Sequence, residues 1–276
     1  MRALVMSDLH FGAEDRRAIA SAARFAQTYR PDAILVAGDL SMYGRRRELD
    51  AAADWLQTLG APVVCTPGNH DTPFWDIVAR ARAPFARYAA FVDGFATTLF
   101  QAPSLVARAI NTARGMQLRW NWALGVIDIA EVSAAAAALE RAPPQQIRLL
   151  VAHHPFLTPD SSPLSGRTRR GVQAARICAY AGIDVIVTGH LHMPFVEPLP
   201  FGDGLTYAAG CGTLSERVRG VRPSILTLEA EGDLLRATVI DCSGDIAEPG
   251  STLTSRLRPR ALTLEEARRT RADNRG

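Results

Sequence analysis

The chain has 276 residues, of which 47% are hydrophobic and 21% are charged, and its formal net charge is +3. These values are ordinary for a soluble globular protein of one large or two small domains, and so small a charge gives no ground for nucleic-acid binding by itself. No apolar run approaches the roughly 20 residues of a membrane span, and the N-terminus runs straight into an expected strand, so we expect neither a membrane helix nor a signal peptide.

The first part of the chain alternates short apolar runs with amphipathic stretches. Residues 4–6 form an apolar run, and a helix is expected over 15–29, where the apolar side chains share one stripe. Residues 33–37 are apolar without interruption, which is typical of a strand buried on both faces of a parallel sheet. A second helix is expected over 46–59, and a strand over 63–66. Two successive strand–helix–strand units predict parallel pairing with right-handed crossovers.

Residues 72–104 break this alternation and are rich in aromatic residues and arginine, and we take the aromatic segment to extend over residues 72–122. We expect helices or irregular structure that covers a functional site, and a plain helical part of the core is an equal alternative. The regular pattern returns with a strand over 105–110, a helix over 131–140, a strand over 147–152, a helix over 171–180 and a strand over 183–187.

Beyond residue 192 the pattern changes to hairpins, with strands expected over 205–209, 224–229 and 234–240. From Gly244 the periodicity is lost, and a short helix is expected to begin at Thr263. We therefore expect one domain over residues 1–245, followed by an Arg-rich C-terminal extension over residues 246–276.

Two composition details bear on the chemistry. The four cysteines, at positions 65, 178, 211 and 242, are scattered and form no CxxC pair, so we expect buried reduced thiols in a cytoplasmic protein. All basic residues are arginines, so any side-chain cation that meets an anionic ligand is a guanidinium, which suits bidentate recognition.

Polar side chains follow five of the expected strands at the point where each strand ends. They are Asp8 and His10, Asp39, Asn69 with His70 and Asp71, His153 with His154, and His190 with His192. Alternate residues of a strand-like segment point to the same side, so Asp8 and His10 can reach one point together. In layered α/β proteins, ligands bind at such strand ends. His10 alone would be an ordinary surface residue and Asp39 alone a helix cap, but five strand ends together indicate one site.

The side chains at these five ends offer imidazole nitrogens, carboxylate oxygens and an amide oxygen, without sulfur. Such a set suits a transition metal of intermediate hardness, namely Mn, Fe, Zn or Co. There are more ligands than one tetrahedral ion needs. The set therefore predicts two ions that share a bridging carboxylate, roughly 3.5–4 Å apart as in two-metal hydrolases.

The ordered set Asp8-x-His10, Gly38-Asp39, Gly68-Asn69-His70-Asp71, His153 and Gly189-His190-x-His192 resembles the five-block signature of the calcineurin-like metallophosphoesterase family. The blocks span residues 8–192, and none is missing. The resemblance implies an α/β (α+β) fold, a four-layer sandwich of two mixed β-sheets flanked by helices. Within the family, Gly38-Asp39-Leu40-Ser41 and His153-His154-Pro155 are similar to the class III cyclic-nucleotide phosphodiesterases and related bacterial members.

The resemblance also implies a role for each residue. The first metal would be held by Asp8, His10, Asp39 and His192, and the second by Asp39, Asn69, His153 and His190, with Asp39 as the bridge. His70 would stabilise the phosphoryl group or protonate the leaving oxygen, with Asp71 orienting it. His154 would support the metal ligands, serve the structure or bind substrate, and Arg114 is a candidate for binding the substrate phosphate.

The function implied is a dinuclear metal-dependent phosphohydrolase that cleaves a small phosphodiester, such as a cyclic nucleotide, by attack of a metal-bound hydroxide with His70 assisting. A phosphomonoesterase of the same fold is an alternative, as is a nuclease whose Arg-rich tail follows phosphates. A non-catalytic scaffold would predict eroded ligands, and none is eroded. We expect a small phosphodiester as the partner, no membrane and no nucleic acid, and we leave a homo-oligomer open.

Overall fold

The structure is a computed structural model that describes residues 1–93, 95–118, 121–162 and 168–259, and it contains two mixed β-sheets. The seven-stranded sheet has the order β13-β12-β11-β1-β2-β3-β4. Its strands are β1 (Arg2–Met6), β2 (Ala33–Ala37), β3 (Val63–Thr66), β4 (Ala96–Thr97), β11 (Ser224–Glu231), β12 (Leu234–Asp241) and β13 (Glu248–Arg256). Strands β1, β2 and β3 pair in parallel, as expected. Strand β4, which the sequence did not predict, pairs in parallel with β3, and β11 pairs with β1 in the antiparallel sense.

The six-stranded sheet has the order β5-β6-β7-β8-β10-β9. Its strands are β5 (Leu99–Ala102), β6 (Leu105–Ala109), β7 (Ile147–Val151), β8 (Val185–Thr188), β9 (Phe195–Pro198) and β10 (Tyr207–Gly210). The central strands β6, β7, β8 and β10 are parallel, and both edge strands are antiparallel to their neighbours.

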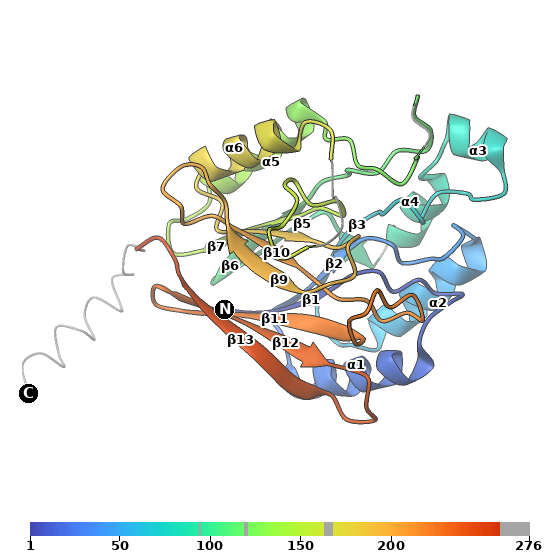
Figure 1. The fold of residues 1–276 in the computed structure, drawn as a ribbon, viewed down its shortest axis with the longest axis horizontal. Coiled ribbons are helices and arrows are strands. Elements are labelled where there is room, and N and C mark those ends of the chain that lie inside the picture. Colours follow the sequence, from blue (N-terminus) through green and yellow to red (C-terminus); the bar gives the residue numbers. More distant parts are fainter. Residues whose placement is uncertain (94, 119–120, 163–167, 260–276) are drawn as a thin grey trace, which may run out of the picture.

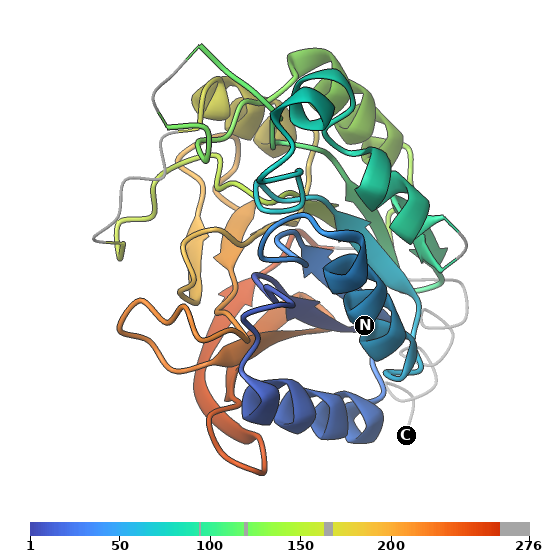
Figure 2. The same ribbon diagram turned by 90° about the vertical axis from the view of Figure 1, so that its right-hand side faces the viewer.

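Helices cover the outer face of each sheet, so the domain has four layers (Figure 1). Helices α1 (Arg16–Tyr29), α2 (Arg46–Gln57) and α4 (Ala86–Val92) share a core with the seven-stranded sheet, and α5 (Ile129–Glu140) and α6 (Gly171–Tyr180) share one with the six-stranded sheet. Figure 2 shows the blue helices α1 and α2 on one side of the strands and α5 and α6 on the other. The expected four-layer sandwich is therefore confirmed.

Strand β1 shows how the sequence produces these layers. Leu4 and Met6 lie in the core beneath the helices, while Ala3 and Val5 lie in a second core between the two sheets. All four residues are fully buried, because both faces of the strand are covered. A strand covered on both faces needs a continuous apolar run rather than alternation. The run at 33–37 predicted β2 for the same reason.

The segment 72–122 is only partly helical. Besides α4 it contains the short helix α3 (Ile77–Arg82), and β4 and β5 take it from one sheet to the other. Tyr88 and Phe91 of α4 are buried in the core with α1 and α2, as the plain-core alternative predicted. Phe74 and Trp75 are instead 48% and 70% exposed. The segment thus divides between core packing and an exposed aromatic surface.

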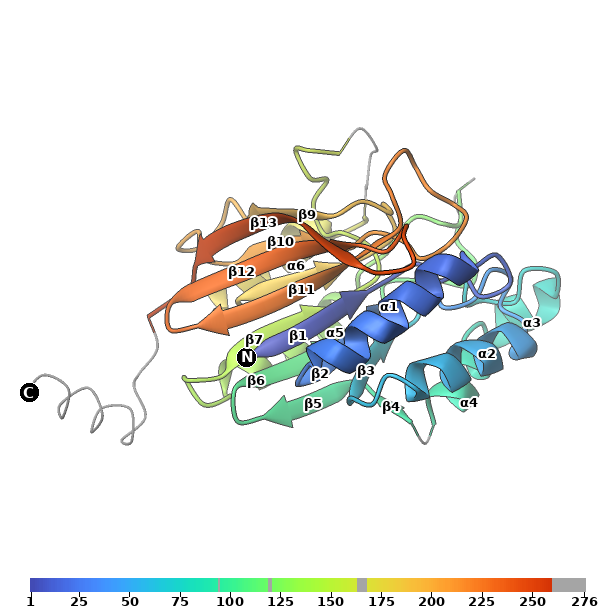
Figure 3. The same ribbon diagram turned by 90° about the horizontal axis from the view of Figure 1, so that it is seen from below.

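The expected loss of regular structure from Gly244 is wrong for β13, which pairs with β12 along the seven-stranded sheet (Figure 3). The expected helix from Thr263 lies outside the described residues. Among the residues that are described, no helix combines the length and the apolarity needed to cross a bilayer. The four cysteines are buried and unpaired, as expected.

Candidate metal centre

The carboxyl ends of β1, β2 and β3 in one sheet and of β7 and β8 in the other meet at one edge of the sandwich. Backbone hydrogen bonds join neighbouring ends, from Asp8 N to Gly38 O and from Gly189 N to His153 O, both at 3.0 Å. Across the two sheets, His190 N donates to Asp8 Oδ2 at 2.9 Å. The five polar strand ends are therefore one structural unit.

Most of the expected metal ligands lie on left-handed backbone. Of the seven non-glycine residues with positive φ in the described part of the chain, five are Asp8, His10, Asp39, His190 and His192, with φ between 46° and 66°. The strand-like geometry expected for Asp8 and His10 is therefore wrong, since β1 ends at Met6. Two left-handed residues, separated by a buried leucine, turn both side chains inward instead. Such conformations in non-glycine residues concentrate at functional sites.

One group of ligand atoms gathers around Asp8. His192 Nε2 lies 3.0 Å from Asp8 Oδ1, and His10 Nε2 lies 3.8 Å from the same oxygen. The two imidazole nitrogens are 3.4 Å apart. All three side chains are buried, and their ligand atoms lie within 4.8 Å of one another.

A second group gathers around His153 on the other side of Asp39. His153 Nε2 lies 3.2 Å from Asn69 Oδ1 and 3.4 Å from Asp39 Oδ2. The same Asp39 oxygen is 3.8 Å from His10 Nε2 in the first group. His190 completes the second group, since its ring centroid lies 5.2 Å from that of His153. Asp39 thus stands between the two groups, where a bridging carboxylate would stand.

These separations fit a pair of metal ions. Ligand atoms at about 2.1 Å from one ion lie about 3.0 Å apart in octahedral and about 3.4 Å apart in tetrahedral geometry. The measured separations, from 3.0 to 3.8 Å, cover that range. Asp8 Oδ1 is buried and, among the described residues, has no hydrogen bond of good geometry, as expected for an oxygen that serves a cation.

Backbone carbonyls orient two of the imidazoles. His192 Nδ1 donates to the carbonyl of Arg217 at 2.8 Å, and His153 Nδ1 donates to that of Ala37 at 2.7 Å. When the imidazole is neutral, each contact selects the tautomer with its lone pair on Nε2, and Nε2 points into the group of ligands. This arrangement is typical of metal-ligating histidines.

The charges of the cluster reinforce one another. Burial alone would raise the pKa of Asp39, but the nearby imidazoles, His153 first, hold it well below its usual value. Burial alone would lower the pKa of His153, but the charge of Asp39 outweighs it and raises that pKa to about 9. Burial lowers the pKa of His10 and of His190 to about 3, which keeps both imidazoles neutral and free to bind a cation.

His70 lies beside the first group without joining the ligands around Asp8. Its ring centroid is 4.7 Å from that of His10, and its backbone N donates to Asp39 Oδ1 at 2.8 Å. Its Nδ1 donates to the carbonyl of Met42 at 2.8 Å, and its Nε2 accepts from Arg217 Nη1 at 2.8 Å. The partly exposed ring thus faces both the metal ligands and an arginine.

The expected role of Asp71 needs correction. Its carboxylate accepts from the backbone N of Gly68 and of Ser41, at 2.8 and 2.9 Å, and from the Ser41 hydroxyl at 2.9 Å. These donors lie on the loops after β2 and β3, so Asp71 holds the two loops together, while Met42 orients His70. Burial, and then the charge of Asp39, raises the pKa of Asp71 to about 6 against these hydrogen bonds.

The two residues expected to contact substrate have protein partners in this structure. His154 is buried, exchanges a hydrogen bond with the Thr112 hydroxyl at 2.9 Å, and donates from Nε2 to Ala123 O at 2.8 Å. Both its nitrogens are therefore used, which agrees with a supporting position beside His153. Arg114 donates to the carbonyl of Ala113, in its own loop, at 2.8 Å. Among the described contacts, none brings Arg114 to the cluster.

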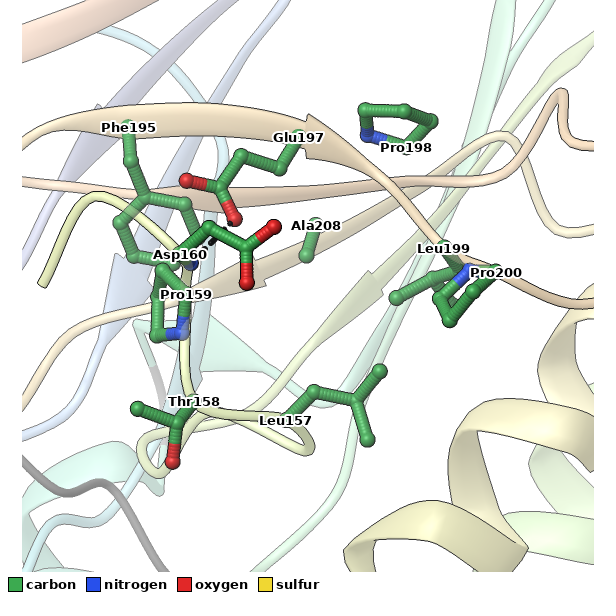
Figure 4. A pocket seen from close by; sticks show the side chains of 10 residues that line it. All are labelled: Leu157, Thr158, Pro159, Asp160, Phe195, Glu197, Pro198, Leu199, Pro200 and Ala208. Carbon is green, nitrogen blue, oxygen red and sulfur yellow. Dashed lines mark hydrogen bonds between the residues drawn. The ribbon is translucent and has the colours of Figure 1, made fainter.

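A separate cavity of about 160 Å³ lies next to β9 and contains none of the expected site residues (Figure 4). Its lining is Leu157, Thr158, Pro159, Asp160, Phe195, Glu197, Pro198, Leu199, Pro200 and Ala208. The carboxylate of Glu197 accepts hydrogen bonds from the backbone N of Asp160 and of Ser161. Those bonds assign the carboxylate to holding a loop, so the cluster rather than this cavity is the candidate site.

Met42 and Arg217 were missed by the sequence analysis. Met42 contributes only its carbonyl oxygen, which no side-chain pattern reveals. Arg217 is one of several arginines between β10 and β11, and nothing in their spacing distinguishes it. Because all basic residues of this chain are arginines, the sequence predicted that any cation in the site is an arginine, but not which one.

Comparison with known proteins identifies the family of the chain. The sequence profile described as calcineurin-like phosphoesterase matches residues 1–194. A Synechococcus protein named "probable cyclic nucleotide phosphodiesterase" is 27% identical over 188 residues, and the match covers 66% of this chain but only 64% of that protein's length.

Two solved structures share the fold at low sequence identity. A dimetal phosphatase from Danio rerio has a TM-score of 0.65 at 12% identity, over 94% of this chain and 99% of that one. The purple acid phosphatase PPD1 from yellow lupin also has a TM-score of 0.65 at 12% identity, over 96% of this chain and 57% of that one. Since the family profile covers well over half of the sequence, the chain belongs to the calcineurin-like phosphoesterase family.

Proposed function

We propose that this protein is a dinuclear metal-dependent phosphodiesterase that hydrolyses a small phosphodiester such as a cyclic nucleotide. The observation that carries the proposal is the buried set of ligand atoms, 3.0 to 3.8 Å apart, in two groups on either side of Asp39. Asp8, His10, Asp39 and His192 would hold one ion. Asp39, Asn69, His153 and His190 would hold the other.

When bound, such a pair of cations lowers the pKa of water and neutralises the non-bridging oxygens of a phosphate. The native ions would come from the group Mn, Fe, Zn and Co, because the donors are nitrogen and oxygen without sulfur. His70 would contact the phosphoryl group or the leaving oxygen, because its ring lies against His10 at the partly exposed side of the cluster. Met42 would hold that ring in orientation through Nδ1.

The diester preference is supported by the name of the Synechococcus relative. A phosphomonoesterase is the second candidate, since the two solved structures described above are named phosphatases. A nuclease that binds DNA phosphates with its C-terminal arginines has less support. Arg258, one of these arginines, already donates hydrogen bonds to Asp203 Oδ1, at 2.7 Å, and to the carbonyl of Ile183. A cytoplasmic location is part of the proposal, supported by four buried, unpaired thiols.

The test begins with metal analysis of the purified protein, followed by hydrolysis of bis(p-nitrophenyl) phosphate, p-nitrophenyl phosphate, cyclic nucleotides and single-stranded DNA. We expect about two ions per chain and preferential hydrolysis of the diesters. Asp39→Ala and Asn69→Ala should abolish activity and lower the metal content. Asp245→Ala, on the surface, is the matched control. A fully metal-loaded protein that hydrolyses none of these compounds would contradict the proposal.

A further inference from the structure

The segment between β10 and β11 takes the chain from one sheet to the other beside the metal centre. Thr213 Oγ1 donates to the carbonyl of Asp8 at 2.7 Å, and Leu214 is fully buried in the core. The carbonyl of Leu214 accepts from Asp15 N at 3.0 Å. The segment is thus fixed by contacts with the β1 loop on one side and with α1 on the other.

Arg217 lies in this segment and contacts both parts of the site. Its carbonyl accepts from His192 Nδ1 at 2.8 Å, which anchors its backbone to a metal-ligand candidate. Its Nη1 donates to His70 Nε2 at 2.8 Å. Because a guanidinium has only donors, His70 must be the acceptor in this contact, with its own proton on the Nδ1 that faces Met42.

The guanidinium of Arg217 retains most of its capacity to bind an anion. It has five N–H donors, and the described contacts use one of them, with His70. Among the ion pairs of the described residues, none includes Arg217, whereas Arg222 on the same loop pairs with Asp241 at 3.1 Å. A partly exposed cation without a carboxylate, directly beside His70, is suited to a phosphate, whose oxygens match the guanidinium fork.

We propose that Arg217 is a substrate-binding residue that donates to the phosphate oxygens of the ester held at the metal centre. The inference rests on the proposed function. In the free protein the guanidinium lies on His70 Nε2. When a phosphate is bound, the guanidinium transfers to its oxygens and leaves His70 Nε2.

The test compares Arg217→Ala and Arg217→Lys with Arg222→Ala. The last variant is the control, because it removes another arginine side chain from the same loop. Binding of inorganic phosphate to the zinc-loaded proteins is measured by isothermal titration calorimetry, and kcat/KM is measured for bis(p-nitrophenyl) phosphate. We expect Arg217→Ala to weaken phosphate binding and to lower kcat/KM by about 10- to 100-fold each, as for loss of a hydrogen bond to a charged group. Arg217→Lys should recover part of both, and Arg222→Ala should match wild type.

Metal content and melting temperature separate substrate binding from a structural role. Arg217→Ala should keep both, because its carbonyl still holds His192. In the ¹⁵N spectrum of His70, phosphate should shift the Nε2 resonance of the wild type as the guanidinium leaves. Loss of metal in Arg217→Ala, or phosphate affinity within about twofold of wild type, would overturn the inference. Arg217-dependent phosphate binding by a protein that hydrolyses no ester would support it while refuting the phosphodiesterase proposal.

Discussion

Replacing Gly68 by alanine tests how tightly the candidate metal centre is packed. A Cβ added at Gly68 would overlap both the Oδ1 and the backbone N of Asp39. The backbone of Gly68 is outside the left-handed region, so alanine adds no dihedral strain and the effect is purely steric. Asp39 Oδ1 also accepts from His70 N at 2.8 Å, and that bond cannot survive if the carboxylate moves aside.

Two effects set the expected magnitude for Gly68→Ala. Inserting a methyl group into a closely packed site costs about 1–3 kcal/mol. Losing the charge-assisted hydrogen bond to Asp39 costs about 1.5–3 kcal/mol. We expect a destabilisation of about 3–5 kcal/mol in urea unfolding of the metal-free protein, and a reduced metal content after reconstitution.

The matched control is Gly60→Ala, at a glycine with φ of 72° and nothing within 4 Å of an added Cβ. Strain without overlap should cost about 1–2 kcal/mol and leave metal binding unchanged. If Gly68→Ala were as stable as wild type and bound two ions, the closeness of Gly68 to Asp39 would not describe the protein in solution.

Three further predictions follow from individual contacts. His70→Ala should keep the metal content and lower kcat on the order of 10²–10⁴-fold, and an empty metal site in this variant would make His70 a ligand instead. His153→Ala should lose metal while His154→Ala, although destabilised by its unpaired partners Thr112 and Ala123, should retain it; the reverse result, by metal analysis, would exchange their roles. Burial alone would raise the pKa of Asp203, but hydrogen bonds from Arg258 outweigh it and lower that pKa. The stabilisation from these hydrogen bonds is therefore present above about pH 4 and is lost as the pH falls below that. The stability difference between wild type and Arg258→Ala, from urea unfolding, should therefore shrink from pH 7 to pH 3, and a constant difference would exclude this linkage.

The strands that carry the site could be predicted from sequence because each is an apolar run that ends in a ligand-type residue. β13 could not, because eight of its nine residues are exposed. An edge strand without a buried face has no apolar alternation, and main-chain pairing with β12 holds it in place. Hydrophobic patterning finds only the strands whose side chains enter a core.

The contacts of Asp71 and Arg217 could not be predicted from the sequence for a different reason. The family resemblance implied that Asp71 orients the His70 ring, but neighbouring side chains need not face one another, and the carboxylate accepts a hydrogen bond from the backbone N of Ser41 instead. Arg217 reaches His70 only because the chain crosses from one sheet to the other at this edge. Candidate metal ligands can be recognised from their residue types in the sequence. The contacts that orient them depend on tertiary geometry, which the sequence does not show directly.

The left-handed backbone of the candidate ligands indicates what fixes their positions. For a non-glycine residue this conformation costs about 1–2 kcal/mol, and it recurs in both the Asp8-x-His10 and the His190-x-His192 segments. The intervening Leu9 and Leu191 are 0% and 2% exposed, so burial of each leucine opposes relaxation of its segment. The hydrogen bonds that Asp8 N donates to Gly38 O and that His190 N donates to Asp8 Oδ2 also oppose relaxation. Packing of the fold therefore holds the candidate ligands in position without a cation, as a preorganised metal site requires.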